Sequence, residues 1–225
     1  MQNRLREINT FDLNFRAYDS SESWAAISIA REIKDQYYVP NLNINKNDVI
    51  IDIGAHVGIF SIYYALKYPD ALIYSYEPTR RNYANLVKSL EYNKINNVFP
   101  NNLAVTSDGR DVEMYQPSDN TGGSSMFYNT KLPFEEKSLA KSIRLKDIIE
   151  NINGKIRILK IDCEGGEYEI LNGNIELLNN AEIIMGELHH VPNTDFNAYK
   201  LYDEITKVVG KERNKLTIIQ TNTII

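Results

Sequence analysis

Residues 48–60 read DVIIDIGAHVGIF, and the fold prediction starts from this stretch. Its first part, residues 48–53, is a nearly continuous apolar run, which is typical of a strand buried on both faces of a parallel sheet. Gly54 and Gly58 then make a loop leading into a helix that is predicted to begin near Ile59. A glycine-containing turn between strand and helix lets backbone N–H groups approach a ligand closely. We therefore expect a binding loop here, the alternative being a tight turn whose glycines serve only the backbone geometry.

Beyond this loop, apolar runs alternate with segments whose apolar residues recur at helical spacing. Strands are predicted at residues 71–76, 98–105, 156–161 and 182–188, and helices at residues 59–68, 80–93 and 145–152 and around 168–171 and 202–209. Short links between such segments are typical of a parallel sheet with right-handed crossovers. We therefore predict an α/β fold, a three-layer sandwich around a mostly parallel sheet. Residues 216–219 and 223–225 are expected to close the sheet as an antiparallel pair.

The first 46 residues are predicted to be a strand and helix extension in front of a main domain formed by residues 47–225. Phe11 and Phe15 belong to an alternating apolar and polar run, which indicates a short strand. Asp19 and Glu22 resemble a capping arrangement for the helix that follows. This helix either packs on the main domain or covers its ligand cleft, and the sequence leaves both possibilities open.

Composition limits the classes of partner and location. The formal charge of −5 and the lack of a dense basic run argue against a nucleic-acid surface. Cys163 is the single cysteine, so no internal disulfide and no cysteine metal cluster can form, which fits a reducing cytoplasm. No apolar run reaches the roughly 18 residues that a membrane-spanning helix requires. We expect a cytoplasmic protein that uses neither membrane nor nucleic acid, and its oligomeric state stays open.

Polar side chains follow the predicted strands at the point where each strand ends. They are Asp52, Glu77, Asn102, Asp162 and Glu187. In an open parallel sheet, ligands bind outside the carboxyl ends of the strands. Any one of these residues is readily explained as a solvated charge or a helix cap. Five in succession predict a shared polar cleft.

Glu77 and Asp52 indicate the kind of ligand. Glu77 lies about 20 residues past the glycine loop, where an acid accepts hydrogen bonds from ribose hydroxyls, and so favours a nucleoside-bearing cofactor. Residues 54–58 lack the middle glycine of a dinucleotide-binding loop, and no P-loop lysine follows. Asp52, an acid before the loop, suits a cationic amino group better than a pyrophosphate. S-adenosylmethionine carries such an ammonium group and a sulfonium as well.

Several motifs, taken together and in order, resemble the FkbM-type methyltransferases. They are DIGAHVG at 52–58, YEP at 76–78, NLAV at 102–105, LKDI at 145–148, KIDCEGGE at 160–167 and GELH at 186–189. The resemblance implies the class I, Rossmann-like S-adenosylmethionine fold with a seven-stranded sheet. It also implies methyl transfer, usually to a hydroxyl oxygen of a sugar, polyketide or other small metabolite.

The same resemblance implies a set of cofactor contacts. They are Asp52, Gly54, Ala55, His56, Gly58, Glu77, Thr79, Asn102 and Ala104. Asp52 would hold the cofactor amino group directly or through water, and Glu77 its ribose. Thr79 and the segment from Asn102 to Ala104 would lie near the adenine, and the glycine loop near the methionine. His56 stands where the family commonly has asparagine.

Three residues are predicted to take part in catalysis: His189, Asp162 and Glu187. Methyl transfer to an alcohol needs positioning and a base for the hydroxyl proton. His189 is the preferred base, because a neutral imidazole titrates near physiological pH. Asp162 would orient the acceptor or take the proton itself. The three together could hold Mg²⁺ or a similar ion, although their spacing does not require a metal.

Other interpretations of the same residues stay open. The chain could be a non-catalytic module that keeps the cofactor site, or a nicotinamide oxidoreductase, which the loop disfavours. Glu164 and Glu167, at the start of a helix, are expected to complement its dipole and be structural. The loop at residues 117–127 is either a plain surface connection or contacts the acceptor.

Overall fold

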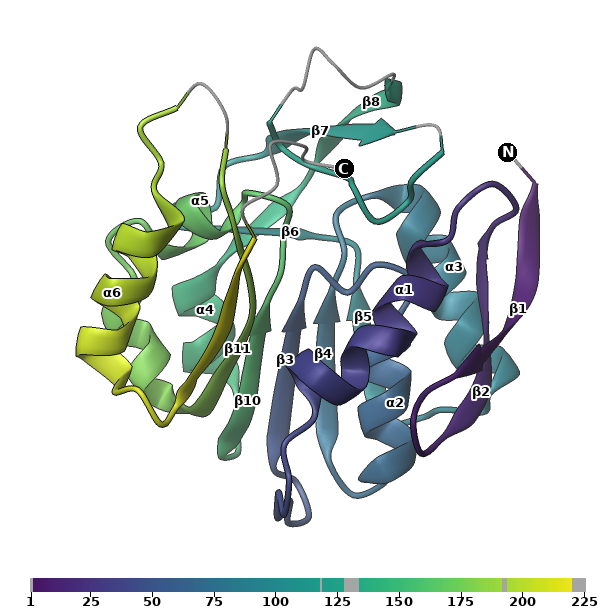
Figure 1. Cartoon of the computed structure of the whole chain (residues 1–225), viewed down its shortest axis with the longest axis horizontal. Coiled ribbons are helices and arrows are strands. Elements are labelled where there is room, and N and C mark those ends of the chain that lie inside the picture. The colour runs from purple at the N-terminus through teal and green to yellow at the C-terminus, as the bar shows by residue number, and fades with distance from the viewer. Residues whose placement is uncertain (1, 118, 128–133, 192–193, 220–225) are drawn as a thin grey trace.

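The computed structural model describes residues 2–117, 119–127, 134–191 and 194–219. A parallel sheet of six strands in the order β12-β11-β10-β3-β4-β5 forms its centre (Figure 1). The strands are β3 (Val49–Ile53), β4 (Leu72–Tyr76), β5 (Val98–Asn101), β10 (Ile156–Ile161), β11 (Ala181–His189) and β12 (Asn214–Ile219). The chain builds outward from β3 in one direction and from β10 in the other. A topological switch point, where ligands bind in such sheets, therefore lies between these two strands.

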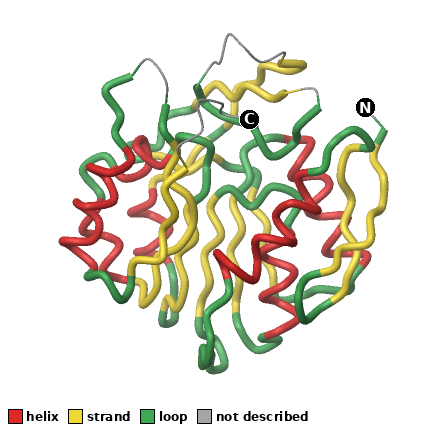
Figure 2. The backbone as a smooth tube through the Cα atoms, in the orientation of Figure 1, coloured by secondary structure: helices red, strands yellow, loops and turns green. Residues whose placement is uncertain are grey.

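Helices cover both faces of this sheet, which confirms the predicted α/β sandwich (Figure 2). One face carries α1 (Ala25–Glu32), the π-helical turn η1 (Ile33–Tyr37), α2 (Ile59–Lys67) and α3 (Arg80–Tyr92). The other carries α4 (Leu145–Asn151), α5 (Glu167–Leu171), the 3₁₀ helix η2 (Ile175–Asn180) and α6 (Ala198–Val209).

The side chains of the central strands point alternately to the two faces of the sheet, which explains the apolar run at residues 48–53. Ile50 packs in the core that contains Phe60 of α2, whereas its neighbour Ile51 packs in the core that contains Ile148 of α4. Successive side chains of a strand point to opposite faces, so a strand covered on both faces needs apolar residues throughout. All five residues of β3 are buried.

The strand count differs slightly from the expected seven. The described residues supply six strands to the central sheet, and residues 223–225, expected to form an antiparallel partner, lie outside them. β12 runs parallel to β11. The strand predicted at residues 98–105 divides into β5 and β6 (Ala104–Thr106), because the Asn102 side chain donates to the carbonyls of Glu77 and Pro78 and turns the chain.

Two small sheets lie beyond the carboxyl ends of the main sheet (Figure 1). β6 pairs in parallel with β9 (Ser142–Arg144), and β7 (Val112–Pro117) pairs with β8 (Phe134–Ala140) as an antiparallel hairpin. Residues 119–127, which follow β7, thereby lie at the ligand-binding edge.

The N-terminal residues form a hairpin and a helix that pack on the α2 and α3 side. The hairpin joins β1 (Asn3–Asn9) to β2 (Asn14–Ser20), and β2 lies along α3. Ile8 and Phe15 share one core cluster with Phe60. The predicted strand starts later than Phe11, because residues 10–13 make a turn in which the Thr10 N–H donates to the Leu13 carbonyl. In the described part of the chain, no helix is long and apolar enough to cross a membrane.

Candidate cofactor and active site

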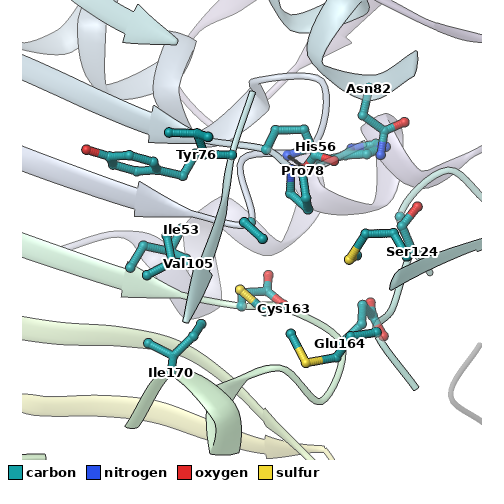
Figure 3. Close-up of a pocket in the computed structure, with 18 residues that line it drawn as sticks. Ile53, His56, Tyr76, Pro78, Asn82, Val105, Ser124, Cys163, Glu164 and Ile170 are labelled. Atoms are coloured by element: carbon teal, nitrogen blue, oxygen red, sulfur yellow. Dashed lines mark hydrogen bonds between the residues drawn. The ribbon is translucent and has the colours of Figure 1, made fainter. Parts of the chain in front are cut away.

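Two adjoining pockets lie at the carboxyl ends of the central strands. We call the first the apolar cleft: it measures about 50 Å³, and its lining includes Tyr76, Pro78, Leu103, Val105 and Ile170 (Figure 3). The second, the acidic pocket, measures about 510 Å³, and its lining includes the carboxyl groups of Glu32, Asp119, Asp162, Glu164 and Glu187. Both are lined by Gly54, His56, Gly122, Asp162 and Glu164, so the two spaces meet at the glycine loop.

The glycine loop between β3 and α2 is held tightly from within. Gly54 has a φ of +78°, and a Cβ added there would lie 1.8 Å from the Asp162 carbonyl oxygen, so only glycine fits. The N–H groups of Gly54 and Ala55 donate to the Tyr76 carbonyl, and that of Gly58 donates to the Ala55 carbonyl. These N–H groups are therefore satisfied inside the protein, contrary to the expectation that they face a ligand. Gly54 instead lets the loop pack against the end of β10, and Gly58 lets it pack against Leu86 of α3.

Glu77, predicted to bind ribose, lies at the wall of the apolar cleft. Its carboxylate accepts from the His56 N–H at 2.9 Å, from the Thr79 N–H at 2.9 Å and from the Thr79 hydroxyl at 2.6 Å. Burial raises the pKa of Glu77 to about 7, although these hydrogen bonds oppose the rise. Thr79 and Asn102 both bond to Glu77, the first to its side chain and the second to its carbonyl. Thr79 and Asn102 thus hold Glu77 in place without lining the cleft, whereas Ala104 lines the cleft itself.

Asp52 is placed differently from the expectation that it holds the cofactor amino group. Its side chain is fully buried beneath the loop, where the Ser61 hydroxyl donates to it at 2.6 Å and Lys160 Nζ lies 3.1 Å away. Lys160 Nζ also donates to the Gly54 carbonyl at 2.9 Å. Burial opposes the charge on Lys160, but Asp52 and Asp162 raise its pKa above the ordinary value. Asp52 therefore helps to hold the loop in place, because it pairs with Lys160 and Lys160 bonds to Gly54. Its burial rules out direct contact with a ligand in this conformation.

His189 is buried among carboxylates, and this environment disfavours its predicted role as general base. Nδ1 lies 3.2 Å from Glu167, and Nε2 lies 3.2 Å from Glu187 and 3.6 Å from Glu164. Burial alone lowers the pKa of His189, but the three acids outweigh it and raise that pKa to about 12. An imidazolium with protons on both nitrogens cannot accept another at neutral pH. His189 is a buried cation that orders the acids around it.

The other two predicted catalytic residues, Asp162 and Glu187, do line the acidic pocket. The Tyr37 hydroxyl donates to Asp162 at 2.9 Å. Glu164, expected to be structural, lines the pocket as well, and burial raises its pKa to about 8 while the charge on His189 opposes the rise. Glu167 is structural as expected, since its buried carboxylate accepts from the N–H groups of Cys163 and Gly165.

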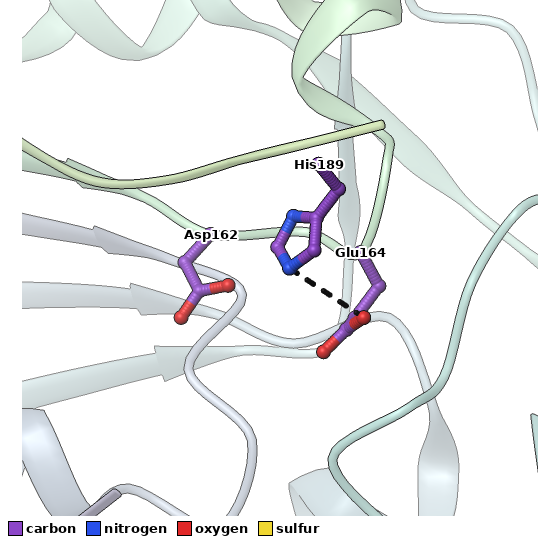
Figure 4. A group of neighbouring side chains, drawn as sticks. All are labelled: Asp162, Glu164 and His189. Carbon is purple, nitrogen blue, oxygen red and sulfur yellow. Dashed lines mark ion pairs between the residues drawn. The ribbon is translucent and has the colours of Figure 1, made fainter. Parts of the chain in front are cut away.

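Asp162, Glu164 and His189 face a common space, with one potential ligand atom of each within 4.8 Å of the others (Figure 4). The metal set considered from sequence contained Glu187 in place of Glu164. A metal ion requires an unprotonated imidazole nitrogen, whereas the carboxylates here stabilise the protonated ring. These three residues therefore form an ion-paired group. A divalent ion could bind to His189 only by displacing a proton from its ring.

Residues 119–127, which follow β7, cover the site rather than forming a plain surface connection. Thr121 is buried, and its Oγ1 lies 2.7 Å from His56 Nε2, 2.8 Å from Asp19 Oδ1 and 2.8 Å from Ser23 Oγ. Its neighbour Gly122 lines both pockets. Asp19 belongs to the N-terminal hairpin, so one hydroxyl joins three distant segments over the glycine loop.

Sequence reasoning missed Lys160, Glu32, Tyr37 and Thr121 as parts of the site. Lys160 left a detectable signal, because a lysine inside the apolar run of β10 must find a partner when both faces are covered. Glu32 and Thr121 lie in the helix and the loop that the sequence left open as possible contacts of the cleft, but no local pattern singles out these two residues or Tyr37.

The fold and the site define a class I methyltransferase: a parallel sheet with a glycine loop and an acidic group at its switch point. Residues 52–215 match the methyltransferase FkbM domain. The chain belongs to the FkbM methyltransferase family.

Individual relatives are more distant. Methyltransferase sdnD of Sordaria araneosa is 26% identical over 174 residues, which cover 64% of this chain and 67% of that protein. Hexuronic acid methyltransferase AglP of Haloferax volcanii is 23% identical over 226 residues, covering 93% of this chain and 89% of that protein. Among solved structures, TYW2 of M. jannaschii in complex with AdoMet is 26% identical with a TM-score of 0.32, covering 43% of this chain and 42% of that one.

Proposed function

We propose that the protein transfers the methyl group of S-adenosylmethionine to a hydroxyl oxygen of a small molecule. The observation that carries this proposal is the junction of the two pockets at Gly54 and Asp162. A cofactor placed across the junction has its nucleoside in the apolar cleft and its two positive groups beside carboxylates. The acidic pocket then holds the acceptor.

The apolar cleft would receive the adenosine. Glu77 accepts the ribose hydroxyls, and Tyr76, Pro78 and Leu103 contact the base. A volume of about 50 Å³ holds a few water molecules and is far below the roughly 300 Å³ of a small ligand pocket, so the cleft must widen when the cofactor enters. Met114 and Met126 line it, and unbranched methionine side chains adapt readily to such a change.

The junction would receive the methionine part of the cofactor. Since Asp52 is buried and paired with Lys160, we assign the cofactor ammonium to Asp162, whose side chain is 20% exposed. The negative charge of the pocket also attracts the sulfonium. Loss of that positive charge on methyl transfer weakens the attraction and favours release of S-adenosylhomocysteine.

Methyl transfer to an alcohol forms an oxygen–carbon bond while the carbon–sulfur bond breaks, and the hydroxyl proton must leave. Glu164 is the better candidate base, because a pKa of about 8 is close to the working pH. Asp162 would position the acceptor hydroxyl, and His189 would hold Glu164 and Glu187 in place. This division of roles replaces the assignment of His189 as base.

The experiment incubates the protein with S-adenosylmethionine and a panel of hydroxylated acceptors, beginning with saccharides because AglP is named for a hexuronic acid. Mass spectrometry should detect a methylated product, and S-adenosylhomocysteine should form at the same rate. Glu164→Gln should lower turnover by about 10²–10⁴-fold with cofactor affinity nearly unchanged, whereas Glu212→Gln, at an exposed position, should have no effect.

Calorimetry with S-adenosylmethionine and with NAD(H) decides between the remaining classes. Tight S-adenosylmethionine binding without any product would support a non-catalytic binding module. Preferential binding of NAD(H) would sink the methyltransferase proposal for this chain.

A further inference from the structure

The chain's single tryptophan lies at the mouth of the acidic pocket. Trp24, directly before α1, is 68% exposed and lines the pocket together with Ala25, Ser28 and Ile29. A solitary exposed aromatic residue is ordinary on a protein surface. An exposed indole in the lining of a pocket is a potential ligand contact, because it offers a flat apolar face.

Trp24 is braced from one side. The guanidinium carbon of Arg6 lies 5.4 Å from the centroid of the ring. Arg6 is itself buried, and its Nη2 donates to the carbonyls of Ser20 at 2.9 Å, Ser21 at 2.9 Å and Ser23 at 2.6 Å. The planar guanidinium is thereby fixed, and a cation over an aromatic face is attractive. The indole is thus held in one orientation before any ligand arrives, which lowers the entropic cost of binding.

The pocket behind Trp24 has an excess of negative charge. Among the described residues, five carboxyl groups line it, and the cationic side chains are those of Lys160 and His189. Both cations are already engaged by fully buried acids, Lys160 by Asp52 at 3.1 Å and His189 by Glu167 at 3.2 Å. Within the described part of the pocket, an anionic ligand would therefore find no cation that is not already paired with an acid.

We propose that Trp24 is the acceptor platform, and that the acceptor is an uncharged or cationic saccharide ring. The apolar face of the ring packs on the indole, and its hydroxyls donate to the carboxylates of the pocket, which can only accept hydrogen bonds when ionised. A uronic acid meets the same carboxylates with a negative charge of its own and is repelled. This assignment rests on the proposed methyltransferase function and adds the residue and the charge that select the acceptor.

Binding can be measured without turnover, because excitation at the red edge reports Trp24 alone. The protein saturated with S-adenosylhomocysteine is titrated with methyl glucoside, glucosamine and glucuronic acid while its emission is followed. We expect the emission to shift to shorter wavelength with the first two sugars and not with the third. A panel that leaves Trp24 emission unchanged, or one in which glucuronic acid binds best, overturns the proposal and leaves the methyltransferase assignment intact.

Variants test whether the indole face itself is used. Trp24→Ala should raise the KM for a sugar that is methylated by about three- to tenfold, the range expected for one aromatic contact. Its affinity for S-adenosylmethionine should be unchanged, and Trp24→Phe should restore most of the lost acceptor affinity. The matched control is Tyr199→Ala, which removes an aromatic residue that is 52% exposed on α6, away from the pocket. Equal KM values in the Trp24→Ala and Tyr199→Ala variants would refute the platform.

Discussion

At the scale of single residues, buried charges in this site serve mainly to place one another. Lys160 and His189 are both buried and both meet more than one carboxylate. Such ion pairs add little net stability, yet removal of one partner leaves an uncompensated charge at a cost of about 3–5 kcal/mol. Three of the acids that these cations hold, Asp162, Glu164 and Glu187, line the acidic pocket, which supports the proposal that carboxylates rather than the imidazole take part in catalysis.

His189 is predicted to remain an imidazolium throughout the neutral range, because its pKa is raised to about 12. Nitrogen NMR of the ring at pH 7 and pH 8 should show protons on both Nδ1 and Nε2. A group with a raised folded-state pKa stabilises the fold fully below its unfolded pKa of 6.5 and less as the pH rises toward 12. A neutral His189 ring at pH 8 would contradict the prediction and restore it as a candidate base.

Glu77 is predicted to make cofactor affinity depend on pH. Its pKa is raised to about 7, and ribose hydroxyls donate more strongly to the ionised form. Affinity for S-adenosylmethionine should therefore increase as the pH rises from 6 to 8. Glu77→Gln should bind the cofactor about 10- to 100-fold more weakly, the loss of a hydrogen bond to a charged group, and show a flat profile. Calorimetry at three pH values measures both effects, and a steep profile retained in Glu77→Gln would assign the titration to another group.

At the scale of elements, the loop between β3 and α2 depends on close approach to β10. Gly54→Ala should be severely destabilising, because the added Cβ would lie 1.8 Å from the Asp162 carbonyl oxygen. The matched control is Gly210→Ala, where φ is +82° against +78° at Gly54 but nothing lies within 4 Å of the added Cβ. The control should lose about 1–3 kcal/mol, because the φ of 82° and ψ of 150° at Gly210 fall in a region that essentially only glycine adopts. Chemical denaturation compares the two variants, and equal losses would mean that the loop is not tightly packed.

The central strands could be predicted from the sequence, whereas the details of the site could not. The apolar runs of β3, β4, β10 and β11 predicted the sheet, because burial on both faces leaves a local signature. The break at Asn102 could not be predicted, since it depends on hydrogen bonds to the carbonyls of Glu77 and Pro78. The protonation of His189 likewise depends on Glu164 and Glu167, which are more than 20 residues away in the chain, as well as on Glu187. Local pattern predicted the presence of a site, and tertiary contacts decided the role of each residue in it.

At the scale of the whole molecule, the N-terminal hairpin belongs to the same core as the central sheet. Phe15 is buried in the cluster that contains Ile50 and Phe60. Phe15→Ala is expected to cost about 3–5 kcal/mol and to lower the midpoint of one unfolding transition for the whole protein. Calorimetry with Phe99→Ala as the exposed control measures this. Two separate transitions in the wild-type protein would show instead that the hairpin folds independently.

The hydroxyl of Thr121 joins the hairpin, the glycine loop and residues 119–127. Its hydrogen bonds also determine which of the neighbouring groups must donate a proton. It has one proton to give, and the hydrogen bond that it donates to Asp19 Oδ1 uses that proton. Ser23 and the Nε2 nitrogen of His56 must then both donate to Thr121. Burial lowers the pKa of His56 and keeps the ring neutral, so its second nitrogen bears a bare lone pair. Asp19, on the N-terminal hairpin, thus determines which ring nitrogen of His56, in the glycine loop, carries the proton.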